Sequence, residues 1–498
     1  MDADVIIIGS GFAGAVAAAR LVDAGIKVLV LERGPWRKTL PVEAAGITDT
    51  APLPRAGGRP GLLIRGMRPA FGPKQIILNK RGLLEMHVAK GIRTVASSSV
   101  GGGSHIWGSV VARPAAADYW DKVTPDLSER QMASHFSRIE TELGAVNPRN
   151  AEDIPNHTSY AWKDVPYFQP VPEEDQLPVA MLLPEKYGGP APSHNRQPST
   201  MQGNDGTYGS VTGAKASVDA IYLIPRLGEN LQVLDLHEAA SVVQANGGYV
   251  ITARDHKQKQ DRVFRANYVI LAAGTMNTVK LLCASEAMGG LQPMPALGKG
   301  FGTNGDCVGL WKPGGDRDST QGIGAQGRLH IPGQPDNIGM FMGGAERPPL
   351  PSWLPGFLAK KAEAVGDAFQ VIGMGEDSAD GRIRFNNGRL ELDYSLENSP
   401  VYERIFTAFD LLAELSGRKV KYSRKQVMTC HPMGGCRISE TEQDGVVNSR
   451  GEVHTSPGLF IADASVFTAP TGSPPTLNIA VWSSYLAEGL AGRIKVQS

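Results

Sequence analysis

The sequence is poor in cysteine, and this scarcity excludes a small disulfide-stapled fold. Its 498 residues include 4 cysteines, too few and too widely spaced for a disulfide framework. The chain is also long enough to form two or three ordinary domains with cores of their own. We expect four free thiols, at Cys283, Cys307, Cys430 and Cys436.

The sequence also lacks an excess of charge of one sign and lacks long apolar runs. The 50 Lys and Arg residues balance the 50 Asp and Glu residues, so the charge does not indicate a nucleic-acid partner. The apolar run that begins at Val5 is four residues long and meets Gly9, far short of a membrane span or a signal-peptide core. We therefore expect a cytoplasmic protein, secreted only if a leader was removed.

The first 34 residues carry the pattern of a dinucleotide-binding βαβ unit. A buried strand, an alanine-rich helix and a second strand are predicted in turn, with Gly9-x-Gly11-x-x-Gly14 at the first turn. Gly9 allows the tight turn, Gly11 lets the backbone approach a pyrophosphate, and Gly14 lets the helix pack against the sheet. Glu32 follows the third glycine by 18 positions and is placed to accept a hydrogen bond from a ribose hydroxyl, which argues against a 2′-phosphate.

Further along the chain, the pattern predicts a mixed α/β fold. Residues 40–80 are rich in Pro and Gly without a sustained period, which predicts an excursion or lid. Beyond them, strand-like and helical segments alternate, so we expect a cofactor domain built from several pieces and a second, sheet-based domain. Strand-like runs lie at 231–244, 247–254, 267–278, 337–344, 369–375 and 381–394, and helical runs at 128–143 and 400–417.

Several motifs in order along the chain carry a resemblance to a known family. They are GSGFAG with Glu32, SVGGGS, LHEAASVV, NYVILAAGTMNTVKLL, LGKGFGTNGD, CHPMGGC and GLFIADASVF. Together they resemble the glucose-methanol-choline (GMC) family of FAD-dependent oxidoreductases, in its cholesterol-oxidase-like branch. The resemblance implies a Rossmann-like FAD-binding domain from residues 1–110, 215–310 and 425–498. It implies a sheet-based substrate domain, with helices on one face, from 111–214 and 311–424.

The resemblance also implies how the cofactor is held. Residues 100–104 would pass beside the isoalloxazine, Ala239 would hold the adenine through its backbone, and Asp463 would lie near the phosphate and ribityl part. Relatives that attach the flavin covalently use a histidine one residue after His105, where this chain has Ile106, so we expect non-covalent FAD. The implied contacts are Gly9, Gly11, Phe12, Ala13, Gly14, Glu32, Arg33, Val100, Gly101, Gly103, Ser104, His105, Ala239, Ala273, Gly274, Asp463, Pro475 and Thr476.

The segment CHPMGGC allows three interpretations. A zinc site needs three or four ligands, usually in close pairs. The segment offers only Cys430, His431 and Cys436. Because the side chains of the adjacent residues Cys430 and His431 should point apart, we predict no metal. A redox pair lacks the C-x-x-C spacing. The third interpretation is a catalytic base, since the unperturbed pKa of histidine lies near working pH. The resemblance implies that His431 lies on the substrate face of the flavin, as this base or as a hydrogen-bond partner that positions the hydroxyl, and we predict the base.

The sequence does not identify the residue that acts together with His431. The family usually has histidine or asparagine just before a proline that begins the last long helix, and this chain has Pro474 there, before Pro475. Ser473, Asn478 or a residue of the substrate domain would have to substitute. Glu346, on a loop before a Pro-rich turn, resembles a loop glutamate that serves as a base in the cholesterol-oxidase branch.

The expected partners are a small-molecule alcohol, and oxygen or another electron acceptor. A secondary ring alcohol such as a sterol is the predicted substrate class. A sugar or glycoside oxidase or dehydrogenase on the same scaffold, and a non-redox lyase or isomerase that retains FAD, remain alternatives. Residues 349–357 (LPSWLPGF with its preceding proline) form an apolar stretch that could contact a membrane, cover an apolar substrate or pack in the core.

Overall fold

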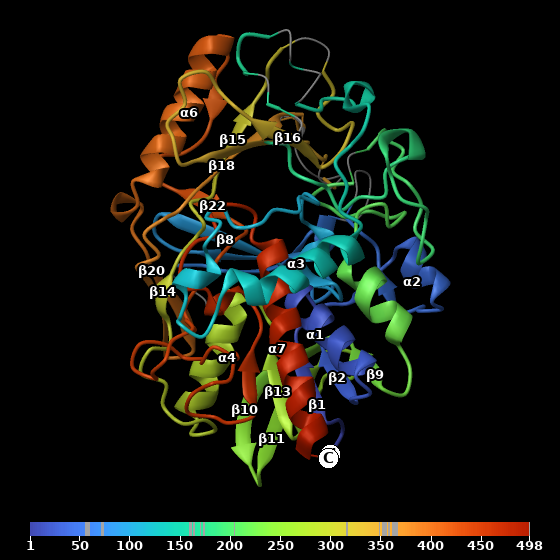
Figure 1. Ribbon diagram of the computed structural model, residues 1–498, viewed down its shortest axis with the longest axis vertical. Coiled ribbons are helices and arrows are strands. Elements are labelled where there is room, and N and C mark those ends of the chain that lie inside the picture. Colours follow the sequence, from blue (N-terminus) through green and yellow to red (C-terminus); the bar gives the residue numbers. More distant parts are fainter. Residues whose placement is uncertain are drawn as a thin grey trace.

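A computed structural model of the chain contains a parallel sheet centred on the N-terminal strand β1 (Figure 1). The strand order is β23-β13-β1-β2-β9, and every neighbouring pair runs parallel. The four residues of β1 are at most 4% exposed, because β1 lies between two strands and under helices, which explains its unbroken apolar sequence. The strands are β1 Val5–Ile8, β2 Val28–Leu31, β9 Leu231–Leu234, β13 Tyr268–Leu271 and β23 Leu459–Ile461.

The structure describes most of the chain. The described residues are 1–54, 60–70, 74–158, 162, 165–169, 171–172, 175–203, 205–314, 317–347, 349–350, 356, 359–360 and 367–497. Most of the apolar stretch 349–357, for which membrane contact, a substrate cover and core packing were the alternatives, lies outside them. Within this described part, no helix has the length and apolarity needed to cross a bilayer.

Helices cover the parallel sheet. α1 packs against α7, and α7 in turn packs against α3, as Figure 1 shows. Residues 12–21 of α1 are all buried, so small alanines suit the tight space between sheet and α7. α3 is capped by Ser128, whose side chain accepts from the backbone of Gln131, and ends at left-handed Gly144. The helices are α1 Phe12–Asp23, α2 Leu40–Ala44, α3 Glu129–Leu143, α4 Thr275–Ala287, α6 Val401–Ser416 and α7 Thr476–Gln497.

A second large sheet is antiparallel, in the order β16-β17-β18-β15-β21. α6 packs against β15, β18 and β21, and Figure 1 shows this layer at the opposite end of the molecule from β1. The fold therefore confirms the predicted class, with a Rossmann-like sheet and a second sheet covered by a helix. The strands are β15 Cys307–Trp311, β16 Ala325–Leu329, β17 Gly339–Gly343, β18 Phe369–Met374 and β21 Val420–Lys421.

A third sheet, β22-β8-β7-β5-β6, lies between these two layers (Figure 1). Two of its strands, β5 and β6, fall inside the Pro/Gly-rich segment 40–80, where the sequence showed no strand period. Its members are β5 Ile64–Arg68, β6 Ile76–Ile77, β7 Leu84–Val88, β8 Ile92–Ser97 and β22 Val427–Thr429.

Smaller sheets complete the described structure. They are the meander of β10 His237–Ala245, β11 Gly248–Asp255 and β12 Gln260–Ala266, the group of β14 Lys299–Phe301, β19 Gly381–Asn386 and β20 Arg389–Asp393, and the pair of β3 Trp36–Arg37 and β4 Thr50–Ala51.

Candidate active site

A cavity of about 570 Å³ opens at the carboxyl ends of β1, β2 and β13. Ligands bind at this edge in open parallel sheets, because the loops there leave a crevice beside the helix N-termini. The cavity lining includes these residues from six segments: 8–13, 31–33, 95–97, 237–240, 272–277 and 430–432.

Close backbone packing shapes one wall of the cavity. A Cβ on Gly9 would lie 2.2 Å from the Ala272 carbonyl oxygen, and a Cβ on Gly14 would lie 1.9 Å from that of Gly9. The glycine-rich segment around Gly102 packs on the same turn, since a Cβ there would lie 2.6 Å from Gly11 Cα. Glycine is required at these positions by the space available. The backbone segments of this wall therefore pack too closely for larger residues at these three positions.

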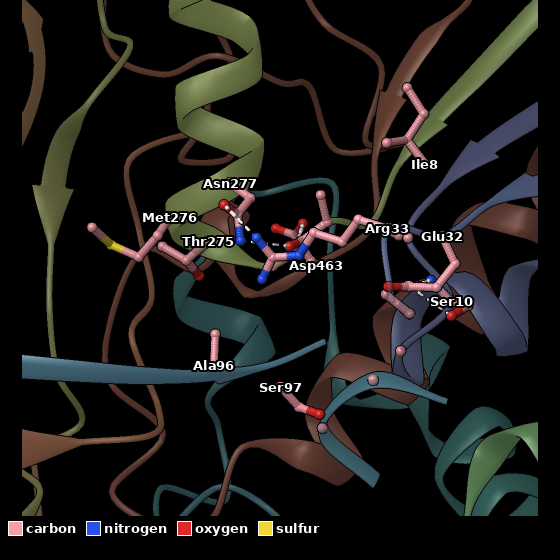
Figure 2. A pocket seen from close by; sticks show the side chains of 18 of the residues that line it. Ile8, Ser10, Glu32, Arg33, Ala96, Ser97, Thr275, Met276, Asn277 and Asp463 are labelled. Atoms are coloured by element: carbon pink, nitrogen blue, oxygen red, sulfur yellow. Dashed lines mark hydrogen bonds between the residues drawn. The ribbon is translucent and has the colours of Figure 1, made fainter. Parts of the chain in front are cut away.

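Glu32 lines the cavity at the end of β2. Its Oε2 accepts hydrogen bonds from the backbone N–H and the hydroxyl of Ser10, at 3.1 and 2.8 Å, and its Oε1 accepts from Gly34 N–H at 2.8 Å. Figure 2 shows Glu32 beside Ser10. Burial raises the pKa of this carboxyl. These bonds hold three of the roughly four lone-pair positions of a carboxylate, which leaves room for one outside donor.

A buried charge cluster lies beside Glu32. Arg33 is hydrogen-bonded to Glu85, and Arg68 lies 3.3 Å and Arg65 3.9 Å from that carboxylate. Although burial alone raises the pKa of Glu85, the arginines hold it well below its usual range. Figure 2 shows Arg33 reaching across the cavity toward Asn277. The cluster therefore brings positive charge to the cavity wall.

Asp463 joins two elements at another part of the wall. Its Oδ2 accepts from Gly274 N–H at 2.9 Å and from the Thr278 hydroxyl at 2.5 Å, and its Oδ1 accepts from Ser465 N–H at 3.0 Å. Burial raises the pKa of this carboxyl. Asp463 thus fixes the N-terminus of α4 against the chain that follows β23.

His431 lines the cavity and is paired with a residue that the sequence did not single out. Its Nδ1 lies 3.0 and 2.9 Å from the two carboxylate oxygens of Asp306. Asp306 is 2% exposed and is held by the Thr429 hydroxyl at 2.7 Å and the Cys430 N–H at 3.3 Å. Burial alone lowers the pKa of His431, but the Asp306 carboxylate and Cys430 raise it well above its usual value. An imidazolium at this position is therefore stabilised.

The side chains of Cys430 and His431 do not point apart, so that part of the argument against a metal was wrong. Cys430 Sγ lies 3.6 Å from His431 Nε2. The backbone between β22 and Pro432 turns so that both side chains face the cavity. Adjacent residues can do this in an irregular loop, where the alternation of a strand does not apply.

Ser473 and Asn478, the candidate partners of His431, and Glu346, the candidate loop base, do not line the cavity. The Ser473 hydroxyl donates to the Arg113 carbonyl, and Asn478 Oδ1 accepts from the Trp120 indole at 3.0 Å. Glu346 accepts from the backbone N–H groups of residues 206 and 208, at 2.8 and 2.6 Å. Each is engaged in holding chain segments together, and Asp306 takes the place beside His431 instead.

The predicted cofactor contacts divide into two groups. His105 is 1% exposed, and its Nε2 lies 2.8 Å from the Val100 carbonyl and 3.5 Å from the Asp219 carboxylate, behind the cavity wall, whereas Ile106 lines the cavity. Also behind the wall are Gly14, Val100, Gly101 and Ser104. The cavity is lined by Gly9, Gly11, Phe12, Ala13, Glu32, Arg33, Gly103, Ala239, Ala273, Gly274, Asp463, Pro475 and Thr476.

Comparison with known families decides the class of the protein. The N-terminal model of the GMC oxidoreductases matches residues 3–303, and the C-terminal model matches residues 406–482. The chain belongs to the GMC oxidoreductase family. This membership confirms the family that the motifs resemble. It also confirms the prediction of an alcohol oxidoreductase, and the family is generally FAD-dependent.

Individual relatives are distant but similar over nearly the whole chain. A cholesterol oxidase of Acinetobacter baumannii is 24% identical over an alignment of 543 positions, and the alignment covers 96% of this chain and 92% of that protein. A long-chain-alcohol oxidase of Arabidopsis thaliana is 21% identical, and the alignment covers 96% of this chain and 66% of that protein. The crystal structure of pyridoxine 4-oxidase from Mesorbium loti superposes with a TM-score of 0.61 at 16% identity, covering 98% of this chain and 99% of that chain. This last likeness shows a shared fold alone.

Proposed function

We propose that this GMC oxidoreductase binds FAD non-covalently and oxidises an alcohol with His431 as the base. The observation that carries the proposal is the Asp306–His431 pair in the wall of a cavity built on the Gly9–Gly14 turn. When bound, FAD supplies the acceptor for the hydride that leaves the alcohol carbon.

The residues present fit this cofactor. Gly11 and Gly103 line the cavity, so their backbones are open to a bound pyrophosphate, and Gly102 packs too closely on Gly11 for any larger residue. Glu32 keeps one acceptor position for a ribose hydroxyl. His105 packs behind the wall and against Asp219, which supports non-covalent binding.

His431 would take the hydroxyl proton through Nε2. Asp306 accepts from Nδ1–H, so the lone pair of the neutral imidazole is on Nε2, which lies 3.6 Å from the Cys430 sulfur; because the pKa of His431 is raised, this neutral form is the one present at alkaline pH. The same carboxylate stabilises the imidazolium that forms when the proton arrives. This arrangement supplies a base and its partner without a donor at Pro474.

We further propose a secondary ring alcohol, such as a sterol, as the substrate class and oxygen as an electron acceptor. The similarity to cholesterol oxidases over 96% of the chain supports both. Long-chain and sugar alcohols are the competing substrate classes within the same chemistry.

The test is anaerobic mixing of the purified protein with sterols, long-chain alcohols and sugars. We expect the flavin absorbance at about 450 nm to fall with a ring alcohol and to return when oxygen is admitted. Bleaching by sugars but not by sterols would overturn the substrate class. Product formed without bleaching would overturn the redox function.

A further inference from the structure

Cys430, His431 and Asp306 form a cluster with the ligand atoms of a metal site. One ligand atom from each residue lies within 4.8 Å of the others. Cys430 is exposed and, like His431, lines the cavity. Alcohol oxidation as proposed above uses His431 and Asp306 but gives the thiol of Cys430 no role.

The distance between sulfur and nitrogen suits a bridging ion. Zinc binds thiolate sulfur at about 2.3 Å and imidazole nitrogen at about 2.0–2.1 Å, so a tetrahedral ion holds the two ligands about 3.6 Å apart. Cys430 Sγ and His431 Nε2 are 3.6 Å apart. The two groups share a hydrogen bond at this distance, so an ion that replaces the shared proton finds both ligand atoms at the spacing that chelation needs.

Asp306 is placed behind the imidazole rather than on the ion. An imidazole nitrogen and a carboxylate oxygen on one tetrahedral zinc ion would lie about 3.4 Å apart. The distances between Nδ1 and the Asp306 oxygens are 3.0 and 2.9 Å, which are those of a hydrogen bond. Carboxylates that bond the far nitrogen of a ligating histidine fix its orientation and strengthen the site.

We propose that Cys430 and His431 bind a soft divalent cation, represented by Zn²⁺, and that this ion inhibits the enzyme by occupying Nε2. The ion replaces the thiol proton, which passes to solvent, and forms bonds to Sγ and Nε2. Two protein ligands leave the remaining positions to water on the cavity side, so the ion exchanges freely, unlike the ion of a closed structural site. The thiolate selects zinc over Mg²⁺, which prefers oxygen ligands.

The test measures Zn²⁺ binding to the flavin-loaded protein by competition with a chromophoric chelator. Cys430→Ser is expected to weaken binding at this site at least about tenfold, and Asp306→Asn by about 10–100-fold. The control is Cys283→Ser, which removes a thiol that does not line the cavity and should bind Zn²⁺ as the parent does. Equal affinity in the Cys430→Ser variant and the parent would overturn the proposal.

A second measurement needs no variant. Zn²⁺ should slow alkylation of Cys430 by iodoacetamide in the parent protein at least about tenfold, followed by mass spectrometry, whereas Mg²⁺ should not. Equal alkylation rates with and without Zn²⁺ would overturn the inference.

The inhibition itself rests on the proposed function, and the two can fail separately. Cysteine-dependent Zn²⁺ binding without any alcohol-driven flavin reduction would contradict the function and leave the metal site standing. Normal flavin reduction in the presence of bound Zn²⁺ would contradict the inhibition alone.

Discussion

Asp306 and His431 form the contact on which the proposed chemistry depends. Asp306 is itself held by the Thr429 hydroxyl, so it fixes both the tautomer and the orientation of the imidazole. Asp306→Asn should slow flavin reduction by a factor of about 10², because the amide can bond the wrong tautomer and carries no charge to stabilise an imidazolium. Stopped-flow absorbance under anaerobic conditions measures this rate.

The two residues should also act as a unit. The double variant Asp306→Asn with His431→Ala should be about as slow as His431→Ala alone, since Asp306 acts through the imidazole. Asp393→Asn, at an exposed pair with Arg384, is the matched control and should reduce its flavin at the parent rate. Additive losses in the double variant would contradict the pairing.

The sequence pointed to His431 but not to Asp306, for a physical reason. His431 stands in a recognisable motif, whereas Asp306 is 125 positions away in the sequence and meets it only when β15 and β22 are in place. The sequence did not predict that the side chains of Cys430 and His431 lie close together. They lie in an irregular loop, whose geometry produces no periodic pattern in the sequence. Ser473 and Asn478 were close in sequence to the expected position, yet their side chains face other partners.

At the turn between β1 and α1, the backbone packs too closely to accept a side chain on Gly14. Gly14→Ala would place a methyl group 1.9 Å from a backbone carbonyl oxygen of Gly9, which cannot swing aside as a side chain can. We expect a loss of about 1–3 kcal/mol in the free energy of unfolding and a fall in bound flavin. Thermal unfolding and the flavin-to-protein absorbance ratio measure both, and an unchanged ratio with an unchanged Tm would contradict the tight packing of α1 on β1.

Gly489 in α7 offers the opposite case. It is exposed, and an added Cβ would meet nothing within 4 Å. Gly489→Ala should raise the free energy of unfolding by up to about 1 kcal/mol, because alanine has the higher helix propensity. A lower Tm for this variant would show that α7 is not helical or not free at this position.

Elements with a strong period were predictable, and short ones were not. Helical spacing of apolar residues gave α3 and α6 to within about a residue of the observed bounds. β5 and β6 were missed because they are short and lie among Pro and Gly. In β5, the buried residues include Arg65 and Arg68, which are paired with Glu238 from β10 and Glu85 from β7. Because charged residues are buried here, β5 lacks the alternation of apolar and polar residues that predicts a strand.

Across the whole molecule, the Glu85 cluster ties three sheets together. Arg33 follows β2, Arg65 lies in β5, and Glu238 lies in β10, where it accepts from Arg65 at 2.7 Å. Glu85→Gln should cost about 3–5 kcal/mol of stability, because it leaves buried arginines without their counter-charge. Chemical denaturation measures the loss, and Glu391→Gln, an exposed strand residue, is the control.

The same cluster predicts how stability depends on pH. The folded pKa values of Glu85 and Glu238 lie below the ordinary value of 4.5, so their contribution is complete above that pH. It is lost as the pH falls below 4.5 through the folded pKa values. We expect Tm to fall more steeply with acid in the parent than in Glu85→Gln, and parallel curves would contradict the role of the cluster.

The overall architecture was predictable because the cofactor motifs occur in the family's order from one end of the chain to the other. The N-terminal and C-terminal family models match the chain in that order. The domain boundaries stay a prediction, because strands from distant parts of the chain share sheets, such as β22 with β8, and composition does not mark where one unit ends.

The most direct test of the account is the rate of flavin reduction by an alcohol substrate in His431→Ala, measured anaerobically by stopped flow. We predict a fall of about 10² or more relative to the parent, with the flavin content and Tm unchanged. His454→Ala, a histidine that does not line the cavity, should reduce its flavin at the parent rate. A His431→Ala variant that reduces its flavin as fast as the parent would contradict the assignment of His431 as the base.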